Sequence, residues 1–305
     1  MISLRQHVVT IVAIFLALAL GMLAGSAFVQ PRLVDTLRTQ VESLRGQMDD
    51  LRSNVTDLND RLAQEQAFND GALPHLTAGR LTGLEIVVIA QDGVEDAVVT
   101  ETRQALEEAG ATAIVLSARA TLAPQDQEGQ TALASLLDLP GAAPEDLPTL
   151  AAEALADRLA SSERRDPPGQ GLLHRLLAEG YLAPVDANLS EETLSTIGGS
   201  DQMVVVLAGG GSQDPVMGPA DFAVPLVERL ADLGLVVAAG ESVDTAVPFV
   251  PLLRASGIDG VVTVDDLDES RGGAALVLGL QQLRLTGDGG DYGVKGDAAP
   301  LPPLP

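Results

Sequence analysis

Cysteine is absent from this sequence, and aromatic residues make up only 2% of it. The absence of cysteine excludes disulfide bonds, thiolate metal sites and a cysteine nucleophile. With so few aromatic side chains, a core drawn from a hydrophobic content of 46% must consist mainly of Val, Leu, Ile and Ala. This mixture is typical of buried parallel strands packed against alanine-rich helices.

Positive charge is also scarce. The chain has 18 Lys and Arg residues against 43 Asp and Glu residues, a formal net charge of −25, and Lys295 is its only lysine. A nucleic-acid-binding protein needs a basic surface, so this class of function is excluded. The length of 305 residues is enough for one large domain, or two small ones, with accessory segments.

A long apolar run lies near the N-terminus. Residues 8–29 carry no charge, and they are bounded by Arg5, within a short flank at residues 1–7, and by Arg32. As a helix these 22 residues span about 33 Å, enough for the hydrocarbon core of a bilayer. A cleavable signal peptide ending near residues 25–27 is the alternative. An amphipathic helix follows without a break, which favours a retained transmembrane helix.

The charges around this helix bear on its orientation. Arg32, Arg38 and Arg45 lie beyond its C-terminal end and weakly favour a cytoplasmic location for the C-terminal part of the chain. Long domains, however, translocate largely regardless of charge, and this one is strongly acidic. We therefore expect a single-pass protein of the plasma membrane with an extracytoplasmic soluble domain.

Small residues recur on the apolar helix. Ala17, Gly21 and Gly25 lie one turn apart, and a small face of this kind allows two membrane helices to approach closely. Glycine is also common in membrane helices generally. The small face therefore indicates dimerisation only together with the segment that comes after it.

That segment, residues 33–68, contains a heptad repeat. All nine a and d positions are apolar, with leucine at every d position and valine at three of the five a positions. This pattern predicts a parallel two-stranded coiled coil and hence a homodimer. The expected dimer seam consists of Val34, Leu37, Val41, Leu44, Met48, Leu51, Val55, Leu58 and Leu62.

Three arginines flank this seam. Arg38, Arg45 and Arg52 occupy successive e positions, and in a parallel homodimer the e positions meet the partner's g positions, where Gln meets Arg and no ion pair forms. One interpretation is an ordinary solvated surface. The alternative is a stripe that docks an acidic helix of another protein.

Short apolar strands alternate with helices in residues 80–286, which predicts an α/β domain. The expected sheet is mostly parallel, of the Rossmann or flavodoxin-like kind. A helical insertion is expected near residues 124–200, and the Gly- and Pro-rich residues 287–305 are expected to be a disordered tail. The expected strands are residues 84–90, 113–116, 203–208, 235–239 and 260–264.

A glycine-rich turn is one candidate for ligand binding. Residues 209–212, Gly-Gly-Gly-Ser, follow an expected strand, and α/β sheets bind ligands at such places. The turn could cradle a phosphate, but the dinucleotide fingerprint is incomplete and no Gly-Lys-Ser/Thr loop occurs. A plain turn is the favoured interpretation.

Other candidate chemistry is sparse. Four acids between the last expected strand and helix could bind Ca²⁺ or Mg²⁺, but capping of the helix is favoured. The three histidines show no metal-ligand spacing, and no nucleophile elbow occurs. We therefore expect no enzyme and no catalytic, cofactor-binding or metal-ligating residues. The acids are Asp265, Asp266, Asp268 and Glu269, and the histidines are His7, His75 and His174.

The order of anchor, heptad repeat and α/β domain, together with several short motifs, resembles the actinobacterial MctB family, whose members are often called copper transporter proteins. The motifs are Met-Ile-Ser-Leu-Arg-Gln-His at residues 1–7, Gly-Ser-Ala-Phe at 25–28, Phe-Asn at 68–69, Val-Thr-Val-Asp-Asp at 262–266 and Asp-Tyr-Gly at 291–293. The resemblance implies membrane association and a role in copper homeostasis. It also implies a link to SteB, a similar protein that works with SteA in cell division and the control of cell-wall hydrolysis.

The sequence contains few residues that could bind copper. Copper(I) favours Cys and Met sulfur, and copper(II) favours His, but the chain has no Cys, five Met and three isolated His. A single apolar helix without ionisable residues is not a pore. We therefore expect a non-catalytic, dimeric envelope scaffold with a SteA-like division partner. The alternatives are a copper export component and a ligand- or nucleotide-sensing domain.

Overall fold

The computed structural model describes residues 4–161, 171–185, 189–211 and 215–303, except for the side chains of residues 4, 26–34, 70, 191, 192 and 195. The chain divides into two compact units, Met1–Ala67 and Phe68–Pro305.

Helix α1 spans Leu4–Thr77. The first unit contains α1 up to Ala67, and the last turns of α1 belong to the second unit. Within α1, Arg5–Gly25 is long and apolar enough to cross a membrane, with a mean hydropathy of 2.6 and none of its residues buried. A signal sequence near an N-terminus has the same character, so this segment is a candidate membrane span. The expected span at residues 8–29 extends further, but the side chains of residues 26–29 lie outside the described part.

The expected seam lies on the exposed surface of α1. Its side chains from Leu37 to Leu62 are between 45% and 63% exposed in the single chain, whereas the side chain of Val34 is among those that are not described. Burial of such a seam requires a second helix, so the coiled coil and its parallel dimer stay predictions.

The second unit contains a seven-stranded sheet in the order β3-β2-β1-β4-β5-β6-β7. Every neighbouring pair is parallel except β2 with β3. The mostly parallel α/β sheet expected from the sequence is thereby confirmed, and its parallel strands follow the flavodoxin-like order. The strands are β1 (Glu85–Gln91), β2 (Thr112–Ala118), β3 (Leu182–Pro184), β4 (Met203–Leu207), β5 (Val236–Gly240), β6 (Val261–Val264) and β7 (Gly290–Tyr292).

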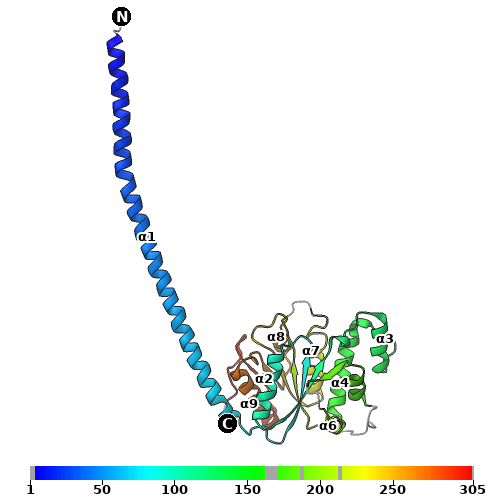
Figure 1. Cartoon of the computed structure of the whole chain (residues 1–305). Helices are drawn as coiled ribbons and strands as arrows, with labels where there is room; N and C mark the ends of the chain where they lie inside the picture. Colours follow the sequence, from blue (N-terminus) through cyan, green and yellow to red (C-terminus); the bar gives the residue numbers. More distant parts are fainter. Residues whose placement is uncertain (1–3, 162–170, 186–188, 212–214, 304–305) are drawn as a thin grey trace. The chain divides into compact units, whose positions relative to one another are not determined.

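Helices cover both faces of this sheet (Figure 1). Alternate residues of β1 point to opposite faces, so Ile86 and Val88 belong to one core while Val87 and Ile89 belong to the other. The first core is closed by α2 (Asp96–Glu108) and α9 (Ser270–Thr286). The second is closed mainly by α4 (Leu147–Ala160), α7 (Ala223–Asp232) and α8 (Val250–Ser256).

The expected helical insertion is largely helical where it is described. Besides α4 it contains α3 (Gln127–Leu136), α5 (Leu172–Ala178) and α6 (Glu191–Thr196). It also contains β3, which the sequence did not predict, paired antiparallel with β2.

The C-terminal segment differs from the disordered tail that we expected. Gly290–Tyr292 forms β7, which pairs in parallel with β6, and Tyr292 is 4% exposed. Glycine is required beside it, because a Cβ on Gly289 would lie 2.2 Å from the carbonyl oxygen of Val261. The glycines that suggested disorder therefore allow close approach of the backbone to the sheet.

Candidate functional site

The glycine turn after β4 is packed against its own chain. A Cβ on Gly210 would lie 2.3 Å from the carbonyl oxygen of Gly93, and one on Gly209 would lie 2.6 Å from Oγ1 of Thr245. The amide of Ala246 donates to the carbonyl oxygen of Gly210 at 2.9 Å. Residue 212 lies outside the described part. Close backbone packing accounts for Gly209 and Gly210, and this supports the interpretation as a plain turn.

Three carboxylates follow directly after β5 and β6 at the carboxyl edge of the sheet. Glu241, Asp265 and Asp266 are each no more than 1% exposed. Burial of an ionised carboxylate is strongly unfavourable unless it is paired and hydrogen-bonded. Each of them has a basic partner: Lys295 for Glu241, Arg254 for Asp265 and Arg271 for Asp266.

Glu241 was not singled out from the sequence, although its place immediately after a buried strand was a signal for it. Its Oε2 accepts hydrogen bonds from the amides of Phe249 at 2.6 Å and Val250 at 3.1 Å, where α8 begins. Its Oε1 accepts one from Nζ of Lys295 at 2.8 Å. Glu241 therefore caps α8 and anchors the C-terminal segment at the same time.

The acidic cluster before α9 does not cap that helix as expected. The N-cap residue of α9 is Glu269, which makes no side-chain capping hydrogen bond. Asp265 and Asp266 are instead paired with arginines, and Oδ1 of Asp268 accepts from the amide of Val243 at 2.8 Å. The buried members of this cluster hold neighbouring segments together, which the sequence around one helix terminus could not reveal.

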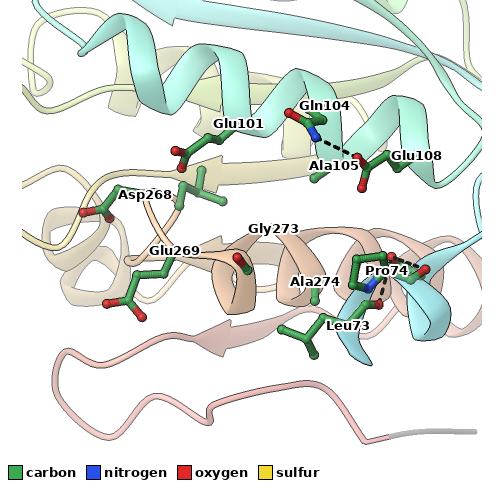
Figure 2. Close-up of a pocket in the computed structure, with 13 residues that line it drawn as sticks. Leu73, Pro74, Glu101, Gln104, Ala105, Glu108, Asp268, Glu269, Gly273 and Ala274 are labelled. Carbon is green, nitrogen blue, oxygen red and sulfur yellow. Dashed lines mark hydrogen bonds between the residues drawn. The ribbon is translucent and has the colours of Figure 1, made fainter. Parts of the chain in front are cut away.

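A groove of about 360 Å³ lies between α2 and α9 beside the last turns of α1. Its apolar lining includes Leu73, Ala105 and Ala274. Figure 2 shows acidic side chains on both sides of it, from α2 and from the residues just before α9. These are Glu101, Glu108, Asp268 and Glu269, and no basic residue lines the described groove.

The electrostatics of the groove are repulsive. Burial, and to a lesser extent the charge of Asp268, raises the pKa of Glu101 above its usual value. The sequence did not predict this grouping, because Glu101 and Glu108 look like ordinary solvent-facing residues of an amphipathic helix. Among the described residues, no three His, Cys, Asp or Glu side chains are placed to hold a metal ion.

The residues that could bind copper do not come together. Met203 and Met217 are both buried, but in the separate cores on opposite faces of the sheet. His174 lies in α5, and His75 lies in the last turn of α1. The donor set that copper prefers is therefore not assembled within the described part of the chain.

The predicted sites of the first unit all lie on α1. Ala17, Gly21 and Gly25 are exposed, and a Cβ on either glycine would meet nothing within 4 Å. The predicted stripe of Arg38, Arg45 and Arg52 is exposed as well. These positions are open to a partner, and their roles stay predictions.

Comparison with known proteins identifies the family. The chain matches the model for the family described as "Copper transport outer membrane protein, MctB" over residues 1–303. It is 26% identical, over 305 residues and 96% of each chain, to the protein named Copper transporter MctB of Mycobacterium tuberculosis (strain ATCC 25618 / H37Rv). It is 28% identical, over 313 residues and 96% of each chain, to the protein of that name from Mycobacterium leprae (strain TN). The chain therefore belongs to the MctB copper transport family.

Proposed function

We propose that this chain is a non-catalytic, dimeric scaffold of the cell envelope. The N-terminal part of α1 anchors it in the plasma membrane as a single span, and the second unit is extracytoplasmic. The observation that carries the proposal is the exposed seam of α1, where leucine, valine and methionine recur in strict heptads over residues that, apart from Gly46, are otherwise polar or charged. A continuous apolar stripe on an exposed helix marks an interaction surface.

The physics of long helices supports a partner for this seam. Helices in water gain most of their stability from the packing of an apolar face. The seam extends for about 43 Å at the rise of an α-helix, and its described side chains meet no core in the single chain. A second copy in parallel register would place leucine against leucine at each d position.

The small face of the membrane span is a separate feature from the seam. Counting back in heptads from Val34 places Ala17, Gly21 and Gly25 at e, b and f positions, not at a or d. The two faces therefore do not form one continuous stripe in a single heptad register. The seam carries the proposal of a dimer, and the small face is an additional contact that requires its own test.

The arginine stripe supplies the proposed means of recruiting a partner. In the parallel dimer, Gln40 and Gln47 of one helix face Arg45 and Arg52 of the other, so the dimer interface does not neutralise these arginines. Exposed guanidinium groups at regular spacing suit the carboxylates of an acidic helix. We assign this partner to the SteA-like division protein that the family resemblance implies.

The copper role in the family's description is indirect in this proposal, because the described residues do not gather copper ligands. Copper export and ligand sensing are the competing functions. Titration of the full chain in detergent with Cu(I) and with Cu(II) distinguishes copper export from a scaffold. Stoichiometric binding at micromolar or tighter affinity would favour a copper export component.

The absence of cysteine makes the dimer directly testable. Leu44→Cys introduces a single thiol at a d position, and oxidation of the full chain in membranes should yield a disulfide-linked dimer. Gly46→Cys, on the outer f face of the same helix, is the matched control and should not form the disulfide-linked dimer. Leu51→Cys, at the next d position, is a second test of the seam. Equal crosslinking of Leu44→Cys and Gly46→Cys, or no crosslinking at either Leu44→Cys or Leu51→Cys, would contradict the parallel seam.

The partner is tested by co-purification from crosslinked membranes. The charge reversals Arg38→Glu, Arg45→Glu and Arg52→Glu together should abolish capture of the division protein while the disulfide-linked dimer persists. Arg61→Glu is the control, because Arg61 is an exposed arginine of the same helix that lies outside the stripe. Capture that survives the triple reversal would refute the stripe.

A further inference from the structure

A second feature of the α/β unit is independent of the dimer. Residues 293–299, here called the strap, cross the carboxyl edge of the sheet beyond β7. The amides of Val294 and Lys295 donate to Oδ1 of Asp265 at 2.7 Å and 3.1 Å. The amide of Ala299 donates to the carbonyl oxygen of Asp291 at 2.9 Å, which returns the strap to the sheet.

The side chain of Lys295 reaches further into this edge than the backbone does. Its Nζ donates to Oε1 of Glu241 at 2.8 Å and to the carbonyl oxygen of Ser242 at 3.0 Å. The Glu241 side chain is fully buried in this arrangement, while that of Lys295 is 26% exposed. A buried carboxylate and a carbonyl oxygen therefore hold a single ammonium group.

Arg254 fixes the strap from the other side. Its Nη1 donates to Oδ2 of Asp265 at 2.5 Å and to the carbonyl oxygen of Lys295 at 3.1 Å. Gly293 is the entry to the strap, with φ at +124°, and a Cβ there would lie 2.3 Å from Oδ1 of Asp265. The chain thus crosses this edge in a conformation that only glycine allows.

Open α/β sheets bind their ligands outside the carboxyl ends of the strands, where this strap lies. The identity of the residue is informative as well, because the chain uses arginine at its other 17 basic positions and lysine here. A planar guanidinium forks toward two acceptors in one plane, whereas a compact ammonium directs three donors around one nitrogen. Nζ bonds two acceptors, the Glu241 carboxylate and the Ser242 carbonyl oxygen, and a primary ammonium reaches both from one nitrogen.

We propose that the strap is a self-occupying lid: Lys295 fills a site for a primary ammonium group at the carboxyl edge, and an external primary amine binds there only when the strap or its lysine is displaced. Displacement would leave the Glu241 carboxylate without its cation, so the open site selects for a cationic replacement. The α/β unit therefore keeps a ligand site that its own C-terminal segment closes.

Chemical rescue of the full chain in detergent tests this site. Lys295→Ala removes the atoms from Cγ to Nζ, which propylammonium replaces. The variant should melt at a lower temperature than the wild type, and propylammonium chloride should restore more than half of the loss. Tetramethylammonium chloride, which has the charge but no N–H donor, should not restore it. The wild type should not respond to either salt beyond the effect of ionic strength.

Two further measurements keep the proposal open to refutation if Lys295→Ala does not fold. Hydrogen exchange of the wild type should show protected amides at Val294 and Lys295, and rapid exchange there would rule out the strap. Lys295→Arg keeps the charge but should still lose stability. An unchanged melting temperature for Lys295→Arg, or equal responses of the wild type and Lys295→Ala to propylammonium, would overturn the ammonium site.

Discussion

Arg271 donates to Asp266 from Nε at 3.1 Å and from Nη2 at 2.9 Å, and both bonds reach the same oxygen, Oδ2. The other oxygen, Oδ1, is buried and has no hydrogen-bond partner within the described part of the chain. Burial raises the pKa of Asp266 above its ordinary value of 3.8, and the hydrogen bond and charge of Arg271 only partly oppose this effect. The folded state therefore binds this proton more tightly than the unfolded state.

This relationship gives the first prediction, for Asp266→Asn. A carboxyl group whose pKa is raised by folding disfavours the native state above that pKa, and the penalty disappears as the pH falls below the unfolded value. The variant should melt at or above the wild-type temperature at pH 7, and the difference should shrink as the pH approaches 3.8. Thermal unfolding followed by circular dichroism over this pH range measures both effects.

Asp265→Asn is the control for that experiment. Asp265 accepts hydrogen bonds from Val294, Lys295 and Arg254, so its replacement removes a charge that the fold fully pairs. This variant should lose stability at pH 7. A loss at Asp266→Asn as large as that at Asp265→Asn would show that Arg271 fully compensates the burial of Asp266.

The second prediction concerns the acidic groove. Glu101→Gln removes the carboxylate whose pKa is raised by burial and by Asp268, so it should raise the melting temperature slightly at pH 7. The gain should shrink as the pH falls toward the ordinary carboxyl value of 4.5 and disappear below it, because the folded and unfolded states then both bind the proton. Glu107→Gln, on the same helix but outside the groove, should change little at either pH. Equal changes in melting temperature for Glu101→Gln and Glu107→Gln would show that the groove does not cause the gain.

The third prediction concerns the glycine turn. Gly210→Ala places a Cβ against the backbone of Gly93, which cannot move aside as a flexible side chain can, so we expect a loss of about 1–3 kcal/mol in the free energy of unfolding. Gly211→Ala is the adjacent control, because its Cβ would meet only Oε1 of Glu95 at 3.9 Å. Denaturant unfolding of both variants measures the difference. If Gly210→Ala leaves the free energy of unfolding unchanged, the turn is again a candidate site for a ligand.

The fourth prediction concerns β7. Tyr292→Ala should create a cavity beside β6 and cost about 3–5 kcal/mol, as for other large buried aromatic side chains, because Tyr292 is 4% exposed. Leu285→Ala, at the end of α9, is the control and should have little effect because Leu285 is 70% exposed. If Tyr292→Ala unfolds at the same denaturant concentration as Leu285→Ala, the C-terminal segment is not part of the core.

The sequence was most informative where local pattern alone determines structure. Buried parallel strands are nearly continuous apolar runs, so β1 and β4 were predicted to within one residue at each end. By contrast, β3 and β7 have three residues each and contain Pro184 and Gly290. Such strands have no recognisable apolar period, and it is the neighbouring strand that determines their conformation.

The candidate sites depended more than the strands did on contacts between residues far apart in the sequence. Lys295 and Glu241 are separated by 54 residues, and Glu101 is still further from Asp268, so no local spacing could associate them. The acids before α9 were recognised as a cluster, but their partners Arg254 and Lys295 lie on other segments. The heptad seam needed no such contact to be recognised, because its period is local, and the helix that would bury it stays a prediction.

The two outer strands of the sheet have one more consequence. Unpaired strand edges are templates for aggregation, and proteins protect them with very short strands and with proline. β3 and β7 are three residues long, and Pro184 has no amide hydrogen to offer to an incoming strand. A protein that is concentrated at a membrane surface meets its own copies often. These short edge strands make edge-to-edge β-pairing between copies unfavourable.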